Sequence, residues 1–291
     1  MLVALWAYYI YQNFAPKPPY YPTGSLDRNY EPQIPLEIVI SMYKEPVEDV
    51  SSFITSLEQT TVLAGARVII YIKDQDVNAE DIRQRTNATR VTKLANIGRE
   101  GETYLHHINT HWERLAKHTI FLQADVHNSR EFYPRLRSFF HSQRTGYLSL
   151  GPSDICDCQH CGDQFFWKDN TGIFPEYYSH VHNSTQDACK HVSLSYKGQF
   201  IVSAARIRGI DKNIYKNLWH AFVDENSWAH QPEFLRGRSD SMSAPRFGYS
   251  MERMWNLLFQ CSDMDVAWKC PSMISGWRLG GDIGDCQCFD T

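Results

Sequence analysis

Strand-like and helix-like patterns alternate through the first half of the chain. Four apolar runs, three of them rich in β-branched residues, predict buried strands: residues 35–43, 66–72, 119–123 and 146–150. Apolar residues at helical spacing predict helices between them: residues 46–57, 101–116 and 131–141. This alternation predicts an α/β fold with a mainly parallel sheet and helices on both faces.

The pattern changes in the second half. Residues 152–190 are polar, contain cysteine and glycine, and lack a clear period, which predicts a long functional loop or an inserted subdomain. A strand pattern returns at 198–203, and helical patterns follow at 210–223 and 249–261. We expect three segments: an apolar arm or anchor with a Pro-rich linker (1–35), one α/β domain (36–260) and a Cys-containing tail (261–291).

The N-terminal segment 2–14 is mostly apolar or aromatic and is followed by a Pro-rich stretch. As a helix it would cover about 20 Å, less than the ~30 Å hydrocarbon core of a membrane. Three interpretations stay open: the remnant of a signal anchor, a short signal-peptide core, or an apolar arm packed on the domain. Its aromatic residues also suit a membrane interface, so membrane association through residues 2–14 is one expectation.

The composition is that of a globular protein of enzyme size. The 291 residues are 43% hydrophobic and 21% charged, which excludes disordered and fibrous chains. With 29 Lys and Arg against 33 Asp and Glu, the net charge of −4 provides no broad basic surface for nucleic acid. A local phosphate pocket is compatible with this balance.

Five of the eight cysteines lie in two clusters: Cys156, Cys158 and Cys161 in one polar loop, and Cys286 and Cys288 near the C-terminus. An even number of cysteines in polar loops favours disulfides and an oxidising compartment, so we expect the secretory pathway or a membrane-associated location. One alternative is a zinc knuckle that includes His160 and is closed by Cys189 or the C-terminal pair. Free thiols are the other alternative.

Ligands of open α/β sheets bind beyond the carboxyl ends of the strands. Charged residues follow three predicted strands: Lys44 and Glu45, Lys73 and Asp74, and Asp125 and His127. In an extended segment Asp125 and His127 point the same way, and this pair can share one divalent cation. The alternative is that Asp125 caps the following turn and His127 is solvated.

A second candidate site lies at the start of the helix predicted after residue 100. Gly98 and Gly101 flank an Arg-Glu pair, so backbone amides would be exposed at the helix N-terminus beside the guanidinium of Arg99. This arrangement predicts a cradle for a phosphate or carboxylate, with Glu100 or Glu102 as acid, base or metal partner. The alternative is a capped turn with an internal ion pair.

Several of these segments together resemble a fungal family, the domain of unknown function 3431. The segments that carry the resemblance are residues 38–41 with Glu45, 96–108, 121–127, 198–203 and 251–255. The resemblance spans about residues 36 to 260. The family looks like a relative of GT-A nucleotide-sugar glycosyltransferases, in which an Asp-x-Asp motif after a central strand holds Mn²⁺ or Mg²⁺ against a diphosphate.

The resemblance implies a GT-A-like fold and a metal-assisted glycosyltransferase with a nucleotide-activated donor and an unknown acceptor. Asp125 matches the first acid of the motif and His127 replaces the second, so the divalent cation (Mn²⁺ or Mg²⁺) is expected there. The expected substrate-binding residues are Lys73, Gly98, Arg99, Gly101 and Gln123. The expected catalytic residues are Glu45, Glu100 and Glu252.

Two other functions stay open beside this transferase. Fungal arginine-containing cyclodipeptide synthases, which use aminoacyl-tRNA, are suspected of a GT-A-like architecture, and such a protein would be cytoplasmic and serve secondary metabolism. The Asp-Asp-x-x-Glu motif associated with them is missing here, and the balanced charge offers no evident tRNA face. The third hypothesis is a non-catalytic luminal binding protein with a degenerate GT-A core.

Overall fold

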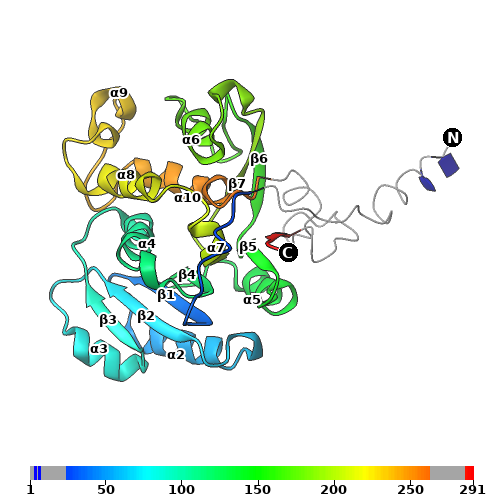
Figure 1. The fold of residues 1–291 in the computed structure, drawn as a ribbon. Coiled ribbons are helices and arrows are strands. Elements are labelled where there is room, and N and C mark those ends of the chain that lie inside the picture. Colours follow the sequence, from blue (N-terminus) through cyan, green and yellow to red (C-terminus); the bar gives the residue numbers. More distant parts are fainter. Residues whose placement is uncertain (1–2, 5, 8–23, 263–285) are drawn as a thin grey trace.

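The computed structural model describes residues 3–4, 6–7, 24–262 and 286–291 (Figure 1). Most of the predicted apolar arm, residues 2–14, therefore lies outside the described residues. Within the described part of the chain, no helix is long and apolar enough to cross a membrane.

A seven-stranded sheet forms the centre of the molecule, in the order β3-β2-β1-β4-β8-β5-β9 (Figure 1). Its strands are β1 (Leu36–Met42), β2 (Arg67–Ile72), β3 (Arg90–Lys93), β4 (His118–Gln123), β5 (Thr145–Ser149), β8 (Phe200–Ser203) and β9 (Gln287–Phe289). The first four in the spatial order are mutually parallel. Because β8 is antiparallel to both β4 and β5, strands β1 to β5 all run in the same direction.

Helices cover both faces of this sheet because successive residues of its strands point to opposite sides. In β1, Ile38 and Ile40 belong to the core on one face, and Val39 belongs to the core on the other. The first face is covered by α2 (Val47–Glu58), α3 (Ala79–Thr86) and α5 (Ser129–Phe139). The second face is covered by α4 (Arg99–Thr110), α8 (Lys212–Val223) and α10 (Phe247–Leu258). The predicted fold class is confirmed.

The predicted Cys-rich insertion is more ordered than its sequence pattern indicates. It contains β6 (Ser153–Asp157) and α6 (Ile173–His182), and β6 pairs with β7 (His191–Ser195) in a second, two-stranded sheet. The short helices α7 (Ala204–Ile207) and α9 (Pro232–Leu235) complete the helices of the described domain. The helix predicted over 101–116 is shorter than expected, since α4 ends at Thr110 and β4 already begins at His118.

Disulfides account for every described cysteine. Three bonds join Cys156 to Cys161, Cys158 to Cys189 and Cys261 to Cys288, and Cys286 is disulfide-bonded as well. The zinc-knuckle alternative is wrong, because the sulfurs that it needs are bonded to one another and His160 is exposed. Disulfides persist in oxidising compartments, so this pattern favours such an environment for the protein.

One buried arginine holds the C-terminal strand against the sheet. The Arg206 side chain is fully buried and donates hydrogen bonds to the carbonyl groups of Phe259, Gln260 and Phe289. Its Nε also lies 2.8 Å from Oδ1 of Asp290. Arg206 thus connects the end of α10 and β9 through one guanidinium group.

We predict that Arg206→Met lowers the free energy of unfolding by about 3–5 kcal/mol, because it leaves buried acceptors and Asp290 without their donor. Urea denaturation followed by circular dichroism measures this change. The control is Arg83→Met, which removes an exposed pair with Glu80 and should leave the midpoint nearly unchanged. Equal midpoints for the two variants would contradict the role of Arg206.

Candidate active site

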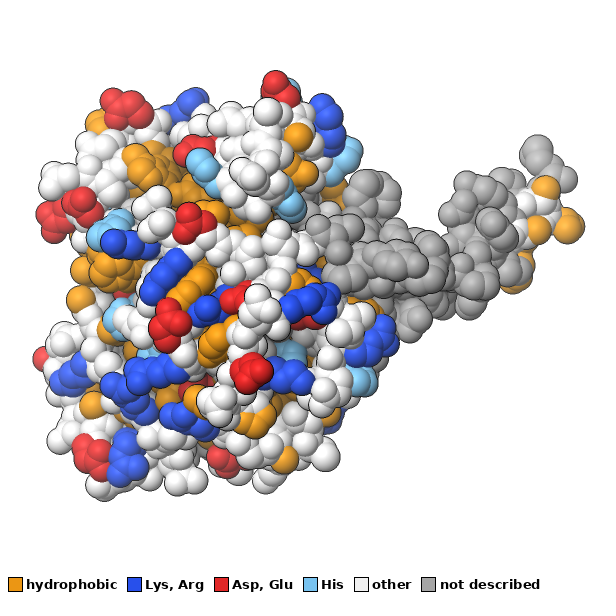
Figure 2. Space-filling model, in the orientation of Figure 1, with side chains coloured by type: hydrophobic (Ala, Val, Ile, Leu, Met, Phe, Trp, Pro, Cys, Tyr) orange, Lys and Arg blue, Asp and Glu red, His pale blue; other side chains and the backbone are white. Residues whose placement is uncertain are grey.

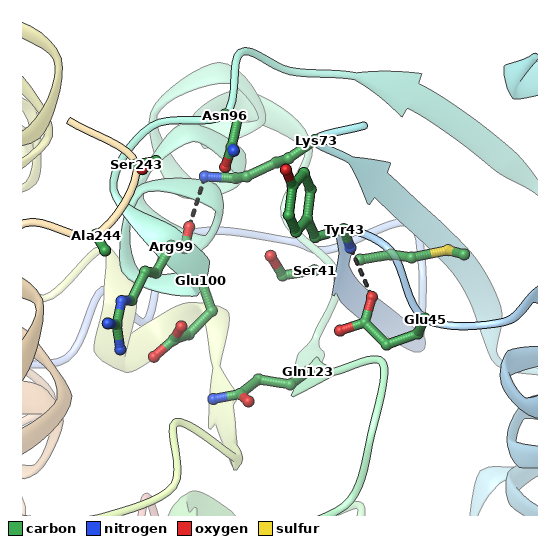
Figure 3. A pocket seen from close by; sticks show the side chains of 11 residues that line it. Ser41, Tyr43, Glu45, Lys73, Asn96, Arg99, Glu100, Gln123, Ser243 and Ala244 are labelled. Carbon is green, nitrogen blue, oxygen red and sulfur yellow. Dashed lines mark hydrogen bonds between the residues drawn. The ribbon is translucent and has the colours of Figure 1, made fainter. Parts of the chain in front are cut away.

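A cavity of about 380 Å³ opens at the carboxyl ends of β1, β2 and β4 (Figure 3). It is lined by Ser41, Met42, Tyr43 and Glu45 around the end of β1, Lys73 after β2, Asn96, Arg99 and Glu100 around the start of α4, Gln123 at the end of β4, and Ser243 and Ala244 before α10. Strand order reverses direction beside β1, because β2 and β4 lie on its two sides. Doubly wound sheets bind ligands at such a switch point.

Glu45, Lys73, Arg99, Glu100 and Gln123, all singled out from the sequence, line this cavity. Figure 3 shows Arg99 and Glu100 on one side and Glu45 on the other, with Gln123 between them. The Glu45 carboxylate accepts a hydrogen bond from the backbone N–H of Tyr43 (2.7 Å). Glu45 therefore holds the segment after β1 at the edge of the cavity.

Lys73 is buried, and its ammonium group has three acceptors. It donates to the carbonyl of Ile97, to that of Arg99 (2.5 Å, Figure 3) and to Oε2 of Glu102 (2.8 Å). Burial lowers the pKa of Lys73, while the adjacent Glu102 carboxylate acts in the opposite direction. An ammonium has three protons to donate, and Lys73 donates all three to acceptors at the start of α4.

The start of α4 has an unusual backbone. Gly98 (φ +68°) and Arg99 (φ +51°) are both left-handed, and no side chain caps the helix. The N–H of Gly98 donates to the carbonyl of Met242 (2.8 Å), while the first N–H groups of α4 itself have no side-chain cap and lie at the positive end of the helix dipole, where anions are stabilised. Gly101 lets this turn pack closely, since a Cβ there would lie 3.1 Å from the Phe222 ring.

Glu100 is a half-buried carboxyl that lines the cavity. Burial raises the pKa of the Glu100 carboxyl and the charge of Glu252 raises it further, while Arg99 and Lys73 oppose these effects. A Cβ on Gly198 would lie 3.5 Å from Oε1 of Glu100, so the backbone of that turn closes over the carboxyl. A carboxyl with a raised pKa in a cavity is suited to acid–base chemistry.

The turn that covers Glu100 is held by side chains from three elements. Lys197 is left-handed (φ +74°), and its N–H donates to Oε1 of Glu252 in α10 (2.6 Å). The Tyr104 hydroxyl of α4 donates to the carbonyl of Gly198 (2.8 Å), and Gln123 at the end of β4 donates to that of Lys197 (3.3 Å). Glu252 thus lies behind the cavity wall, close enough to act on Glu100 through its charge.

Asp125 and His127 do not line the cavity. Asp125 is exposed, and Nε2 of His127 lies 3.0 Å from Oε1 of Gln123. Across the described ranges, no group of three or more His, Cys, Asp or Glu side chains could hold a metal ion. The GT-A resemblance implies a divalent cation at this strand end. Asp125 and His127 are the two side chains expected to bind it, and His127 is already hydrogen-bonded to Gln123. The described residues therefore do not assemble a metal centre here.

The loop of residues 242–246 also belongs to this region, although no sequence pattern predicts it. The carbonyl of Met242 accepts the N–H of Gly98 (2.8 Å), and the Arg246 guanidinium lies 4.9 Å from the centre of the Tyr249 ring. The Arg99 guanidinium lies 5.2 Å from the same ring. This stretch is short and has no period, and the local signal is an arginine just before a predicted helix.

Comparisons with known proteins identify a family and a distant structural similarity. The model of a family described as "Protein of unknown function (DUF3431)" matches residues 46–277, and no curated protein matches the chain. Among solved structures, the chain is similar to the mannosyltransferase PcManGT from Pyrobaculum calidifontis in complex with GDP-Man and Mn²⁺, with 12% identity and a TM-score of 0.31. The match covers 70% of this chain and 53% of that one, so the chain spans about half the length of PcManGT. A likeness this weak carries no argument about substrate or metal.

We predict that Gly98→Ala destabilises the protein by about 3 kcal/mol or more, because it adds a clash to the strain of a left-handed alanine. The new Cβ would lie 2.4 Å from Cβ of Glu102 and 2.9 Å from the Phe222 ring. Gly65→Ala is the matched control, since Gly65 is also left-handed (φ +77°) but has nothing within 4 Å of its Cβ position. Thermal and urea unfolding should show a loss of only about 1–2 kcal/mol for the control, and equal losses would contradict the packing argument.

Proposed function

This chain belongs to the family of proteins of unknown function DUF3431, and we propose that it is a group-transfer enzyme, most simply a glycosyltransferase-like protein with a nucleotide-activated donor. The observation that carries the proposal is the Glu100 carboxyl, whose raised pKa and position beside Arg99 pair a proton acceptor with a cation in one cavity. The cavity also lies where doubly wound sheets bind their ligands.

The donor side of the proposed reaction is the start of α4. The first N–H groups of α4 have no side-chain cap, and Arg99, the first residue of this helix, lines the cavity. Phosphate groups bind at such helix N-termini, and a guanidinium matches two phosphate oxygens at once. This arrangement supports a donor that carries phosphate.

The acceptor side of the proposed reaction is Glu100. The acceptor oxygen bonds to the transferred group, the bond from that group to the donor phosphate breaks, and its electron pair leaves on the phosphate oxygen. The acceptor proton goes to the Glu100 carboxylate. Glu45, on the opposite side of the cavity, is placed to contact the acceptor or donor through the carboxylate oxygen that Tyr43 does not use.

We propose the secretory pathway as the compartment, on the strength of the three disulfides. This location favours sugar transfer over the cyclodipeptide alternative, because aminoacyl-tRNA is a cytoplasmic substrate. Expression in a host followed by mass spectrometry for a new cyclic dipeptide tests that alternative directly.

For the wild-type protein we expect release of a nucleoside diphosphate from at least one member of a panel of nucleotide sugars. Glu100→Gln should lower this rate by about 10²–10⁴-fold, because it removes the proton acceptor while keeping the shape of the side chain. Glu80→Gln, on the exposed surface of α3, is the control and should react like the wild type.

Calorimetric titration with the same panel separates the hypotheses. Binding without turnover in both wild type and Glu100→Gln would favour a non-catalytic binding protein. No binding to any nucleotide sugar would contradict the proposed donor class.

Glu252→Gln tests the origin of the pKa of Glu100. The raised pKa means that the reactive carboxylate forms as pH rises through it, so the rate should fall on the acidic side of the profile. The substitution removes the charge of Glu252, while an amide oxygen can still accept the Lys197 N–H. We expect the acidic limb of kcat/KM to move to lower pH, and a limb that stays in place would contradict the electrostatic link.

A further inference from the structure

Two arginines share one aromatic ring at the edge of the cavity. The guanidinium carbons of Arg99 and Arg246 lie 5.2 Å and 4.9 Å from the centre of the Tyr249 ring. Arg99 lines the cavity, and Ser243 and Ala244, from the same loop as Arg246, line it as well. Arg246 itself does not line the cavity, and its guanidinium is linked to that of Arg99 through the Tyr249 ring that both groups contact.

Neither guanidinium is neutralised by a carboxylate at close range. Among the described residues, Arg99 and Arg246 form no ion pair within 4 Å, and the buried Nε of Arg246 has no hydrogen-bond partner. The nearby Asp240 does not fill this role, since its carboxylate accepts the backbone N–H of Arg246 (2.5 Å) and pairs with His230 (2.6 Å). A buried donor without an acceptor loses free energy that a bound anion would restore.

Two arginines that precede this loop, Arg236 and Arg238, carry further positive charge. Burial lowers the pKa of the Arg238 guanidinium, and the charges of Arg246 and Arg236 lower it further, so each of these two arginines lies close enough to repel Arg238. Figure 2 shows several Lys and Arg side chains across the middle of this face, interspersed with Asp and Glu. Repulsion of this kind is relieved by an anion with more than one charge.

We propose that Arg99 and Arg246, packed on Tyr249, bind the diphosphate of the donor and neutralise the charge that develops on it as it leaves, in place of a divalent cation. This inference rests on the proposed function and names the residues that would supply its electrostatic stabilisation. Planar guanidinium groups bind phosphate oxygens in pairs, and fixed cations aimed at developing charge are a large source of catalysis. The described acidic residues, by contrast, assemble no metal centre at the end of β4.

The test measures binding of inorganic diphosphate to the full chain by calorimetry, with EDTA and with added Mn²⁺. We expect binding in EDTA, and an affinity about 10-fold to 100-fold weaker in Arg246→Gln and in Arg99→Gln, the range for losing charge-assisted hydrogen bonds. Arg246→Lys keeps the charge but loses the planar, forked guanidinium, so its affinity for diphosphate should lie between those of the wild type and Arg246→Gln. Arg83→Gln, in an exposed pair on α3, is the control and should bind like the wild type.

Thermal unfolding of each variant shows whether it is folded, and Arg99→Gln serves as the second variant because Arg99 is exposed. Binding that requires Mn²⁺ and is lost in Asp125→Ala would overturn the inference, as would unchanged binding in both arginine variants or no binding at all. The readout is separate from turnover. Transfer that depends on Mn²⁺ would support the proposed function and contradict this inference. Diphosphate binding through Arg246 without any transfer would support this inference and contradict the proposed function.

Discussion

The buried ammonium group of Lys73 is the constraint on which the candidate site depends. A buried charge is costly unless it is fully paired, and here it is matched by Glu102 and by the carbonyls of Ile97 and Arg99. The lysine follows β2 and its acceptors belong to the start of α4, so the sheet and the helix are joined at one point. That link fixes the left-handed conformation of Arg99, which a non-glycine residue adopts only when its surroundings enforce it.

A second turn with left-handed residues lies close to Glu100, near the start of α4. Lys197 and Gly198 are held there by α4, α10 and β4, through Tyr104, Glu252 and Gln123. The two turns flank Glu100, which is half-buried and lines the cavity, and its partial burial is the main cause of its raised pKa. Strained backbone on two sides of one carboxyl is typical of sites that trade local stability for precise geometry.

The Cys-rich insertion is connected to this site through α10. Its Asp163 forms a buried ion pair with Arg253 (2.7 Å) and accepts the hydroxyl of Tyr196 (3.2 Å), which directly precedes the Lys197 turn. Glu252 is adjacent to Arg253 in the same helix. The disulfides therefore stiffen a lobe that packs against the helix carrying Glu252 and Tyr249, and so they support the site without lining the cavity.

The sequence by itself determined the strands and helices whose apolar pattern is continuous, among them β1, β4 and α8, because burial imposes periods of two and 3.6 on a chain. It also located Arg99 and Glu100, since the flanking glycines are local. It could not reveal β3 and α3, which are largely polar, or the ordered elements of the Cys-rich insertion. Only the tertiary structure decided three other relations. Lys73 donates its hydrogen bonds to the start of α4, the charge of Glu252 raises the pKa of Glu100, and the guanidinium groups of Arg246 and Arg99 both contact the Tyr249 ring. These relations join residues far apart along the chain, and no pattern within one segment encodes the distance between two segments.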